Sequence, residues 1–203
     1  KKPGAFILAS AIGWYGDRGD EELDEDSGHG EGFLPSICEE WEAAAAPAGD
    51  SGVRTVFLRS GIVLSGTGGA LGKMLLPFKM GAGGPMAGGK QWMSWISLDD
   101  EIYAIHHLLM NGGSKGVYNL TAPNPSRQKG FAKTLGRVLG RPAFAPLPGF
   151  VVRILFGEMG VTLTLESQKV LPNRLLEEGF EFLHPELEGA LTDTLGAWRD
   201  LKI

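Results

Sequence analysis

Residues 5–16, AFILASAIGWYG, decide the fold class of this chain. The apolar run at 5–9 is typical of a short strand that is buried on both faces, as the strands of parallel sheets are. Polar and aromatic side chains follow, so that Ser10 and Tyr15 come just beyond the predicted strand. Because ligands bind at the carboxyl edge of the strands in open α/β sheets, this stretch predicts a parallel sheet with a site at that edge.

Length and composition predict one domain, or one domain with a small extension. The chain has 203 residues, 43% of them hydrophobic, which suffices for a sizeable core. Its net charge of −5 and its scattered cationic residues argue against nucleic acid or an anionic membrane as a partner. There is one cysteine, Cys38, no signal-peptide pattern and no apolar run near the roughly 20 residues that span a bilayer. These features predict a cytoplasmic protein without an internal disulfide.

Further apolar runs predict the other elements of an α/β fold. The run at 53–64 predicts a second buried strand, which Gly61 interrupts. Ser36 and Glu39 have the spacing of a capping box, and Ser126 is expected to cap a later helix that stops at Gly140. A third strand is predicted at 116–120. Helices are predicted at 36–46, with Trp41 in the core, at 70–80, at 97–109, at 126–139, and within 162–168, 172–179 and 187–195. The helix at 97–109 has Asp99 and Asp100 as caps and an apolar stripe of Leu98, Ile102, Ile105 and Leu109, and the alternation at 180–182 is typical of a short strand.

The glycine-rich segment 65–72, SGTGGALG, matches a dinucleotide fingerprint only in part. Gly66 and Gly68 have the right spacing, but Leu71 occupies the third glycine position. No Asp or Glu follows within 20 residues to bind a ribose hydroxyl. We therefore interpret this segment as the turn that precedes a helix.

Several longer motifs resemble one protein family. The segment ASAIGWYGD at 9–17 resembles the strand end S-(S/A)-x-x-x-Y-G of the extended short-chain dehydrogenase/reductases, the NAD-dependent epimerase/dehydratase group. Together the motifs are similar to those of the "epimerase family proteins" that carry a C-terminal domain of unknown function. The other motifs are RSGIVLSGTGGALGKMLLPF at 59–78, GGKQWMSWISLDD at 88–100, YNLTAPNP at 118–125 and VLPNRLLEEGFEF at 170–182.

This resemblance implies a fold and a cofactor. The expected fold is the C-terminal half of a Rossmann-like doubly wound parallel sheet, residues 1–141, followed by a small, mostly helical extension, residues 142–203. The implied cofactor is NADP or NAD, with its nicotinamide near Ser10, Gly61, Ile62 and Val63. The family's Gly-rich βαβ unit, which holds the adenosine half and selects between the two nucleotides, is expected to lie outside this chain.

The chain departs from the family at the catalytic pair. Typical members carry Tyr-x-x-x-Lys on the helix that corresponds to 36–46, whereas this chain has Cys38 and Glu42 at that spacing, and none of its tyrosines precedes a lysine by four residues. A carboxylate raises the pKa of a neighbouring thiol, so we interpret Cys38 as a structural residue. The remaining candidates for catalysis are Tyr15, which would transfer the proton, and Ser10, which would orient the substrate oxygen.

Other polar and aromatic residues are candidates for binding the substrate. Trp92 and Trp95 would form a wall over a ligand, or alternatively close the core from one side. Asn119, near the end of a predicted strand, is a candidate substrate contact. The acidic loop at 17–32, which includes His29, matches no metal-ligand spacing, so no metal is assigned.

The sequence thus predicts an NAD(P)-dependent oxidoreductase or a sugar-epimerase-like protein that acts on a hydroxyl or carbonyl of a small molecule. The alternative is a non-catalytic NADP-binding protein that has lost the Tyr-x-x-x-Lys pair. A third interpretation is a fragment without a function of its own. The tail, in which Leu187, Leu191 and Leu195 form an apolar stripe, would cover the substrate cleft or form the surface of a homodimer.

Overall fold

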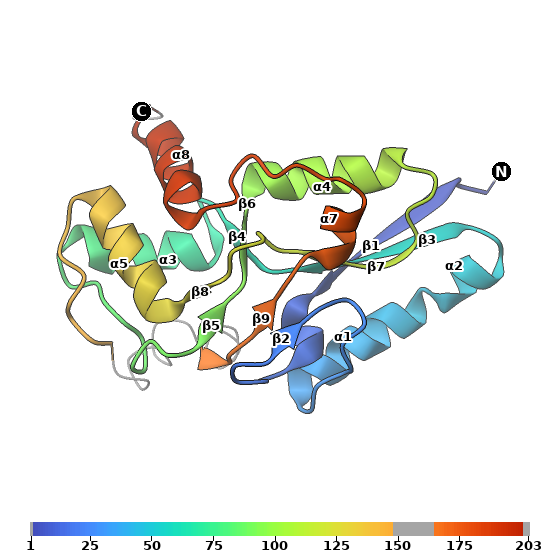
Figure 1. The fold of residues 1–203 in the computed structure, drawn as a ribbon, viewed down its shortest axis with the longest axis horizontal. Coiled ribbons are helices and arrows are strands. Elements are labelled where there is room, and N and C mark those ends of the chain that lie inside the picture. Colours follow the sequence, from blue (N-terminus) through green and yellow to red (C-terminus); the bar gives the residue numbers. More distant parts are fainter. Residues whose placement is uncertain (1, 148–164, 201–203) are drawn as a thin grey trace.

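The computed structural model describes residues 2–147 and 165–200, with side chains as far as residue 196. Strands and helices alternate along the chain, which confirms the predicted α/β class (Figure 1). The elements are β1 (Ala5–Ala11), η1 (Ile12–Tyr15), β2 (Glu22–Leu23), α1 (Phe33–Ala44), α2 (Ala46–Asp50), β3 (Arg54–Ser60), β4 (Ile62–Leu64), α3 (Gly69–Lys79), β5 (Trp92–Met93), β6 (Trp95–Ser97), α4 (Leu98–Met110), β7 (Gly116–Leu120), β8 (Ser126–Arg127), α5 (Gln128–Leu139), β9 (Lys169–Val170), α7 (Asn173–Glu177) and α8 (Leu187–Asp200).

The central sheet has the strand order β1-β3-β7, and all of its pairs are parallel. Ala11 of β1 lies opposite Ser60 of β3, which lies opposite Leu120 of β7, so the carboxyl ends of the strands meet at one edge. β1 is less covered than its apolar run predicts, since Phe6 is 37% exposed. The reason is that β1 pairs with β3 alone among the described strands.

Helices cover both faces of this sheet. α4 lies on one face and α1 on the other, as Figure 1 shows. The α4 side is a core of buried apolar side chains that includes Val56 and Leu58 from β3, Tyr118 from β7 and Leu108 from α4. The α1 side carries the polar ends of the strands, among them Ser10, and this side holds the buried charges described below.

The chain leaves the central sheet at Gly61 and enters a second small sheet. β4 pairs in parallel with β6, and Ile62 lies opposite Trp95. A side chain at Gly61 has no room, because an added Cβ would lie 2.6 Å from the carbonyl oxygen of Ser94. Backbone contact this close requires glycine, which explains why the interrupted strand predicted at 53–64 becomes two strands.

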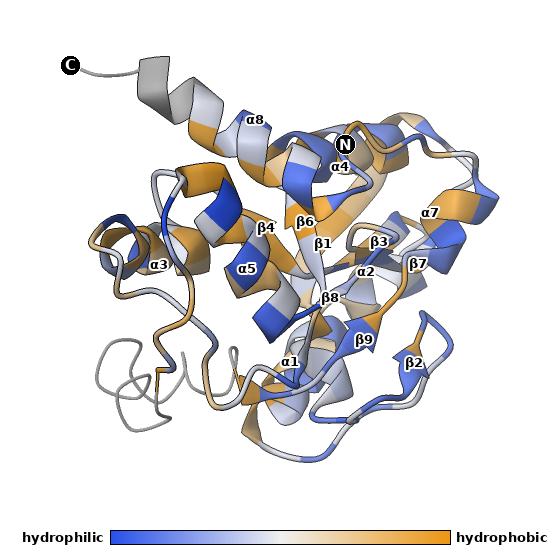
Figure 2. Ribbon diagram, turned by 60° about the vertical axis from the view of Figure 1, so that its left-hand side comes forward, coloured by the Kyte–Doolittle hydropathy of each residue, from blue (hydrophilic) through white to orange (hydrophobic). Residues whose placement is uncertain are grey.

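The C-terminal tail shares a core with the rest of the chain. Helices α3, α5 and α8 pack together, and Figure 2 shows that they carry both apolar and polar residues. The predicted stripe on α8 is buried: Leu187, Leu191 and Leu195 contact the cluster that contains Leu71 and Phe131. Residues 1–141 and 142–203 therefore do not have separate cores in the described part of the chain.

Three predicted helix caps are wrong. α1 begins after Gly32, whose φ is 119°, and the Ser36 hydroxyl donates a hydrogen bond to the Phe33 carbonyl from inside the helix. Ser126 lies in β8, so Arg127 is the residue before α5. The cap of α4 is Ser97, whose Oγ accepts the Asp100 N–H, in place of the acidic caps that we predicted. Such boundaries depend on which side chain the loop brings to the helix end.

Two predictions about apolar side chains also fail. Leu98 and Ile102 of the expected apolar stripe on α4 are exposed, while Glu101 and Leu108 are buried. Trp41 of α1 is 55% exposed and does not pack in the core. The segment at 180–182 forms no strand, and the part of the predicted helix at 162–164 lies outside the described residues. None of the helices in the described part of the chain is long and apolar enough to cross a membrane.

If the tail folds together with the sheet, shortening a buried tail side chain should destabilise the whole chain. Leu191→Ala is expected to lower the free energy of unfolding by about 2–5 kcal/mol, because it leaves a cavity in the shared core. Leu183→Ala, at a side chain that is 58% exposed, should change it by about 0.5 kcal/mol or less. Urea unfolding followed by circular dichroism measures both; two separate transitions would show that the tail is an independent domain.

Candidate functional site

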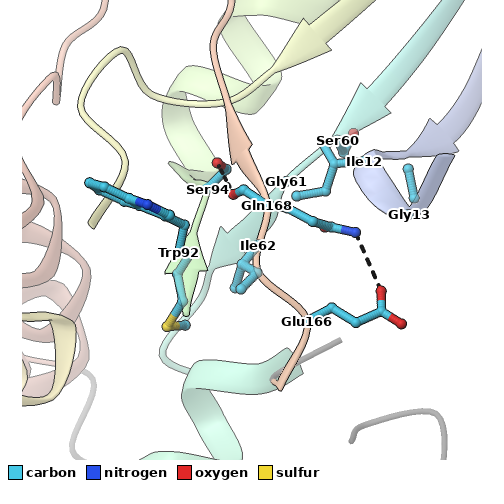
Figure 3. Close-up of a pocket in the computed structure, with 11 residues that line it drawn as sticks. Ile12, Gly13, Ser60, Gly61, Ile62, Trp92, Ser94, Glu166 and Gln168 are labelled. Carbon is cyan, nitrogen blue, oxygen red and sulfur yellow. Dashed lines mark hydrogen bonds between the residues drawn. The ribbon is translucent and has the colours of Figure 1, made fainter. Parts of the chain in front are cut away.

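A small pocket of about 110 Å³ lies at the carboxyl ends of β1 and β3 (Figure 3). This is the edge at which the sequence predicts a ligand site. The junction of β1 and η1 and the junction of β3 and β4 form one side. The segment around β5 and the tail form the other. The lining residues are Ala11, Ile12, Gly13, Ser60, Gly61, Ile62, Trp92, Met93, Ser94, Glu166 and Gln168.

The tail contributes the wall of the pocket that carries Glu166 and Gln168. The Ser94 hydroxyl donates to the Gln168 carbonyl oxygen (2.8 Å), and the Val170 N–H donates to the same hydroxyl (2.8 Å). The Gln168 N–H donates to the Trp92 carbonyl (3.3 Å). These contacts join residues more than 70 positions apart in the sequence and hold the tail across the strand ends.

Of the predicted cofactor-binding residues, Gly61 and Ile62 line the pocket, whereas Val63 packs against the core on the α4 side. The Gly61 N–H donates to the Leu120 carbonyl (3.0 Å) and the Ile62 N–H to the Ser94 carbonyl (2.9 Å). Their main-chain donors are therefore used within the protein. What these two residues present to a ligand is apolar surface and a close approach to the backbone.

The two predicted catalytic residues do not line the pocket. Tyr15 is fully buried, and its hydroxyl donates to Asn119 Oδ1 (2.8 Å) and accepts from Arg59 Nη1 (3.2 Å). Ser10 is buried and donates to Glu42 Oε1 (2.8 Å). Burial raises the pKa of the Tyr15 phenol although Arg59 opposes the rise, so the phenol stays neutral. In this structure the hydroxyls of both residues are bonded to protein partners away from the pocket lining, and the proton transfer by Tyr15 stays a prediction.

The predicted substrate residues divide in the same way. Trp92 lines the pocket, and its ring lies under the guanidinium of Arg127 (4.2 Å to the ring centre), while its Nε1 donates to Asp20 (3.2 Å). Trp95 is fully buried and closes the core, with Nε1 donating to the carbonyl of Asn124. Asn119 is also fully buried. Of the three, only Trp92 can contact a ligand in this pocket.

Comparisons with known proteins identify relatives of this chain. A family described as "Domain of unknown function (DUF1731)" matches residues 147–194. The Arabidopsis thaliana "Epimerase family protein SDR39U1 homolog, chloroplastic" is 44% identical over 94% of this chain and 54% of its own length. The structure of the human epimerase family protein SDR39U1 with NADPH has a TM-score of 0.89 at 42% identity, covering 96% of this chain and 66% of that chain.

This chain belongs to the epimerase family proteins. A nucleoside-diphosphate sugar epimerase from Corynebacterium glutamicum has a TM-score of 0.78 at 33% identity, covering 96% of this chain and 38% of that one. The Rossmann-like fold predicted for the family is thereby confirmed. The chain spans about half of the Arabidopsis relative and about two thirds of the human structure.

The departure of this epimerase family protein from the Tyr-x-x-x-Lys pattern has a structural explanation. Glu42, at the position of the family's lysine, forms a bidentate ion pair with Arg59 (2.8 and 2.9 Å) on the buried face of α1. The Arg59 guanidinium also lies 3.8 Å from the centre of the Trp14 ring. Burial raises the pKa of the Cys38 thiol, and Glu42 adds to the rise. Cys38 is thus a buried thiol of raised pKa beside an ion pair, which fits its interpretation as a structural residue.

Two carboxylates near the pocket, Glu101 and Glu166, were not predicted from the sequence. Glu101 is buried on α4 and accepts a hydrogen bond from the Ser60 hydroxyl (2.6 Å), while its Oε2 has no partner among the described residues. Burial raises the pKa of Glu101 to about 7. Burial and the charge of Asp17 also raise the pKa of Glu166, which lines the pocket itself. Glu101 lies in an acidic first helical turn beside Asp99 and Asp100, and no pattern in the sequence distinguishes it from these neighbours.

One group of side chains in the described residues is close enough together to hold a metal ion. Ligand atoms of Asp99, His184 and Asp193 lie within 4.8 Å of one another, but these residues are not part of the pocket lining. His29, which the sequence analysis considered as a ligand, lies 3.8 Å from Glu39. The pocket offers one carboxylate and no imidazole or thiolate, so nothing in its lining favours a metal.

Tyr15→Phe should act on stability and leave the pocket intact. The change removes a hydroxyl that pairs with Asn119 and Arg59, so we expect a loss of about 1–3 kcal/mol in the free energy of unfolding. Urea unfolding measures this loss, and ligand binding in the pocket should stay within about 2-fold. A fall in turnover of about 10²-fold without a change in stability would instead return the phenol to a catalytic role.

Glu101 should make stability depend on pH. Its folded pKa of about 7 lies above the ordinary value of 4.5, so the folded state holds the proton more tightly and loses stability as the pH rises from about 4.5 to 7. Glu101→Gln removes this titration while keeping an acceptor for Ser60. The variant should be more stable than the parent by up to about 3 kcal/mol at pH 8 and equal to it near pH 4. Chemical unfolding over this range, with the exposed Glu40→Gln as control, tests the prediction; equal curves at pH 8 would contradict it.

Proposed function

We propose that this chain carries the reaction pocket of an NAD(P)-dependent oxidoreductase or epimerase-like protein, with NADP as the dinucleotide and a hydroxyl or carbonyl of a small molecule as the reacting group. The observation that carries the proposal is the pocket at the carboxyl ends of β1 and β3, the position at which open α/β sheets bind ligands. The similarity to the nucleoside-diphosphate sugar epimerase from Corynebacterium glutamicum supports the epimerase-like alternative of this proposal.

The lining of the pocket fits a nicotinamide. Gly13 and Gly61 expose backbone, and Ile12 and Ile62 provide apolar walls on either side. Such walls suit a flat ring, and the side-chain amide of Gln168 is a partner for a carboxamide. The volume of about 110 Å³ suits one ring rather than a whole dinucleotide. The human relative's structure, which contains NADPH, supports the choice of cofactor.

The residues of this chain would position the reactants. The apolar lining excludes water, Trp92 closes one side, and the tail holds Gln168 in place through its backbone bonds to Ser94 and Trp92. A bound nicotinamide would supply hydride chemistry. The enclosure of Tyr15 and Ser10 supports a proton transfer by another group of the pocket.

The alternative function is non-catalytic binding of NADP. The enclosed phenol and the ion pair of Glu42 with Arg59 favour this alternative, since the usual proton-transfer pair is missing. The predicted homodimer, the small-molecule partner and the cytoplasmic location stay predictions. The Arabidopsis relative is named as chloroplastic.

Nucleotide titration tests the proposal. NADPH and NADH are titrated into this chain, and into a chain extended upstream by a Gly-rich βαβ unit, while nicotinamide fluorescence is followed. We expect saturable NADPH binding, at least in the extended chain. Ala11→Phe, which fills the pocket, should weaken binding by about 10-fold or more, whereas Leu76→Phe at an exposed site of α3 should not. If neither chain binds NADPH or NADH, the cofactor and the oxidoreductase function that depends on it are both excluded.

A further inference from the structure

The pocket contains one ionisable side chain among its lining residues. Glu166 has that position, and the other lining side chains are apolar, hydroxyl or amide groups. The residue comes from the tail, within the segment that matches the family of unknown function. Figure 3 shows the Glu166 carboxyl beside the side-chain amide of Gln168. The Gln168 Nε2 donates a hydrogen bond to Glu166 Oε2 at a distance of 3.5 Å. A carboxyl in this position can reach the oxygen of a small ligand.

Glu166 is held in place by the residue that follows it. The Ser167 N–H donates to Asp17 Oδ1 (3.2 Å), and its hydroxyl donates to the Gly19 carbonyl (2.5 Å). The Arg18 N–H donates to the Ser167 carbonyl (3.1 Å). The residue next to Glu166 is therefore bonded to the loop after η1, which places Glu166 beside this loop at the pocket.

The surroundings keep Glu166 able to exchange a proton. Burial raises its pKa, and the neighbouring negative charge of Asp17 adds to the rise. No lysine or arginine belongs to the pocket lining, so no lining cation opposes this effect. A carboxyl with a raised pKa is a better acid at neutral pH than one of ordinary pKa, because a larger share of it is protonated.

Other titratable groups near the pocket have worse positions. Tyr15 is enclosed by Asn119 and Arg59 on the α1 side of the sheet. Glu101 is buried and does not line the pocket; it accepts a hydrogen bond from the hydroxyl of Ser60, which does. Glu166 is thus the group with direct access to a ligand.

We propose that Glu166 is the general acid and base of this pocket, in place of the family's tyrosine; this inference rests on the proposed function. In the reductive direction, a carbonyl carbon of the substrate accepts a hydride from a reduced nicotinamide dinucleotide. The carbonyl oxygen takes the proton from the Glu166 carboxyl as that O–H bond breaks. The products are an alcohol, an oxidised nicotinamide and the Glu166 carboxylate, which regains a proton from water. Oxidation of an alcohol follows the same steps in reverse.

The first experiment measures the affinities for NADP⁺ and NADPH without turnover. It uses whichever chain of the titration above binds NADPH, this chain or the chain extended upstream. A Glu166 carboxylate favours the cationic ring of NADP⁺ over the neutral ring of NADPH, whereas the protonated acid does not. The ratio of the two affinities should therefore shift toward NADP⁺ by about 5-fold or more as the pH rises through the titration of Glu166. Glu166→Gln should make the ratio independent of pH, and Glu177→Gln, at an exposed tail glutamate, should leave the shift in place.

The second experiment measures reduction of 4-nitrobenzaldehyde, a simple carbonyl probe, by NADPH. Glu166→Gln should lower kcat by about 10²-fold or more, with the NADPH affinity within about 2-fold of the parent. Asp17→Asn keeps an acceptor for the Ser167 N–H but removes the neighbouring charge, so the pH at which kcat changes should fall.

The outcomes separate two failures. If NADPH binds and the pH dependence of the affinity ratio is the same in Glu166→Gln, the role of Glu166 is excluded and the proposed function stands. Retention of kcat by Glu166→Gln has the same meaning. If the parent binds neither nucleotide, the proposed function itself fails and the role of Glu166 fails with it. Should the parent not reduce the aldehyde, the affinity ratio alone decides.

Discussion

The site depends on the crossing of two backbone segments at Gly61 and Ser94. The Ile62 N–H donates to the Ser94 carbonyl, and a Cβ at Gly61 would lie 2.6 Å from that oxygen. The crossing ends the central sheet, starts the second sheet and places Ser94 where its hydroxyl can bond Gln168 and Val170 of the tail. Sheet, loop and tail meet at this point, and the pocket is the space that they leave between them. A larger residue at Gly61 would move all three.

On the other face of the sheet, a buried ion pair determines which side chains near the strand ends remain available to a ligand. Arg59 and Glu42 are almost fully enclosed, and neither could lose its partner without leaving a charge in a region of low dielectric. Tyr15 and Ser10 each donate or accept within this group, so their hydroxyls are committed to protein partners. The residues that the family motif suggests for catalysis are thus part of the support for the sheet. The polar side chains that can contact a ligand lie on the pocket side, where Glu166 and Gln168 of the tail line the cavity.

The sequence predicts those parts of the fold that depend on local patterns. The strands at 5–11, 54–60 and 116–120 follow from apolar runs, and Gly140 ends α5 in the left-handed conformation, as predicted. Contacts across the chain decide the rest. The stripe with Leu98 and Ile102 has helical spacing but faces away from the core, because the sheet packs against Leu108 and its neighbours. Periodicity alone identifies the helix and cannot tell which elements will cover each face.

The candidate site was only partly predictable for the same reason. Gly61 and Ile62 line the pocket because they follow the end of β3, a position that the sequence reveals, and Trp92 reaches it from the start of β5. Glu166 and Gln168 reach it from the other end of the chain, through bonds to Ser94 and to the loop after η1, and no local signal marks them.

The tail has two parts in this arrangement. Leu187 and Leu191 of α8 pack in the shared core, and their burial stabilises the attachment of the tail to the rest of the chain, while Glu166 lines the pocket. In the proposal that Glu166 is the general acid and base, the tail supplies the proton donor that typical members of the family are expected to carry on the helix corresponding to α1.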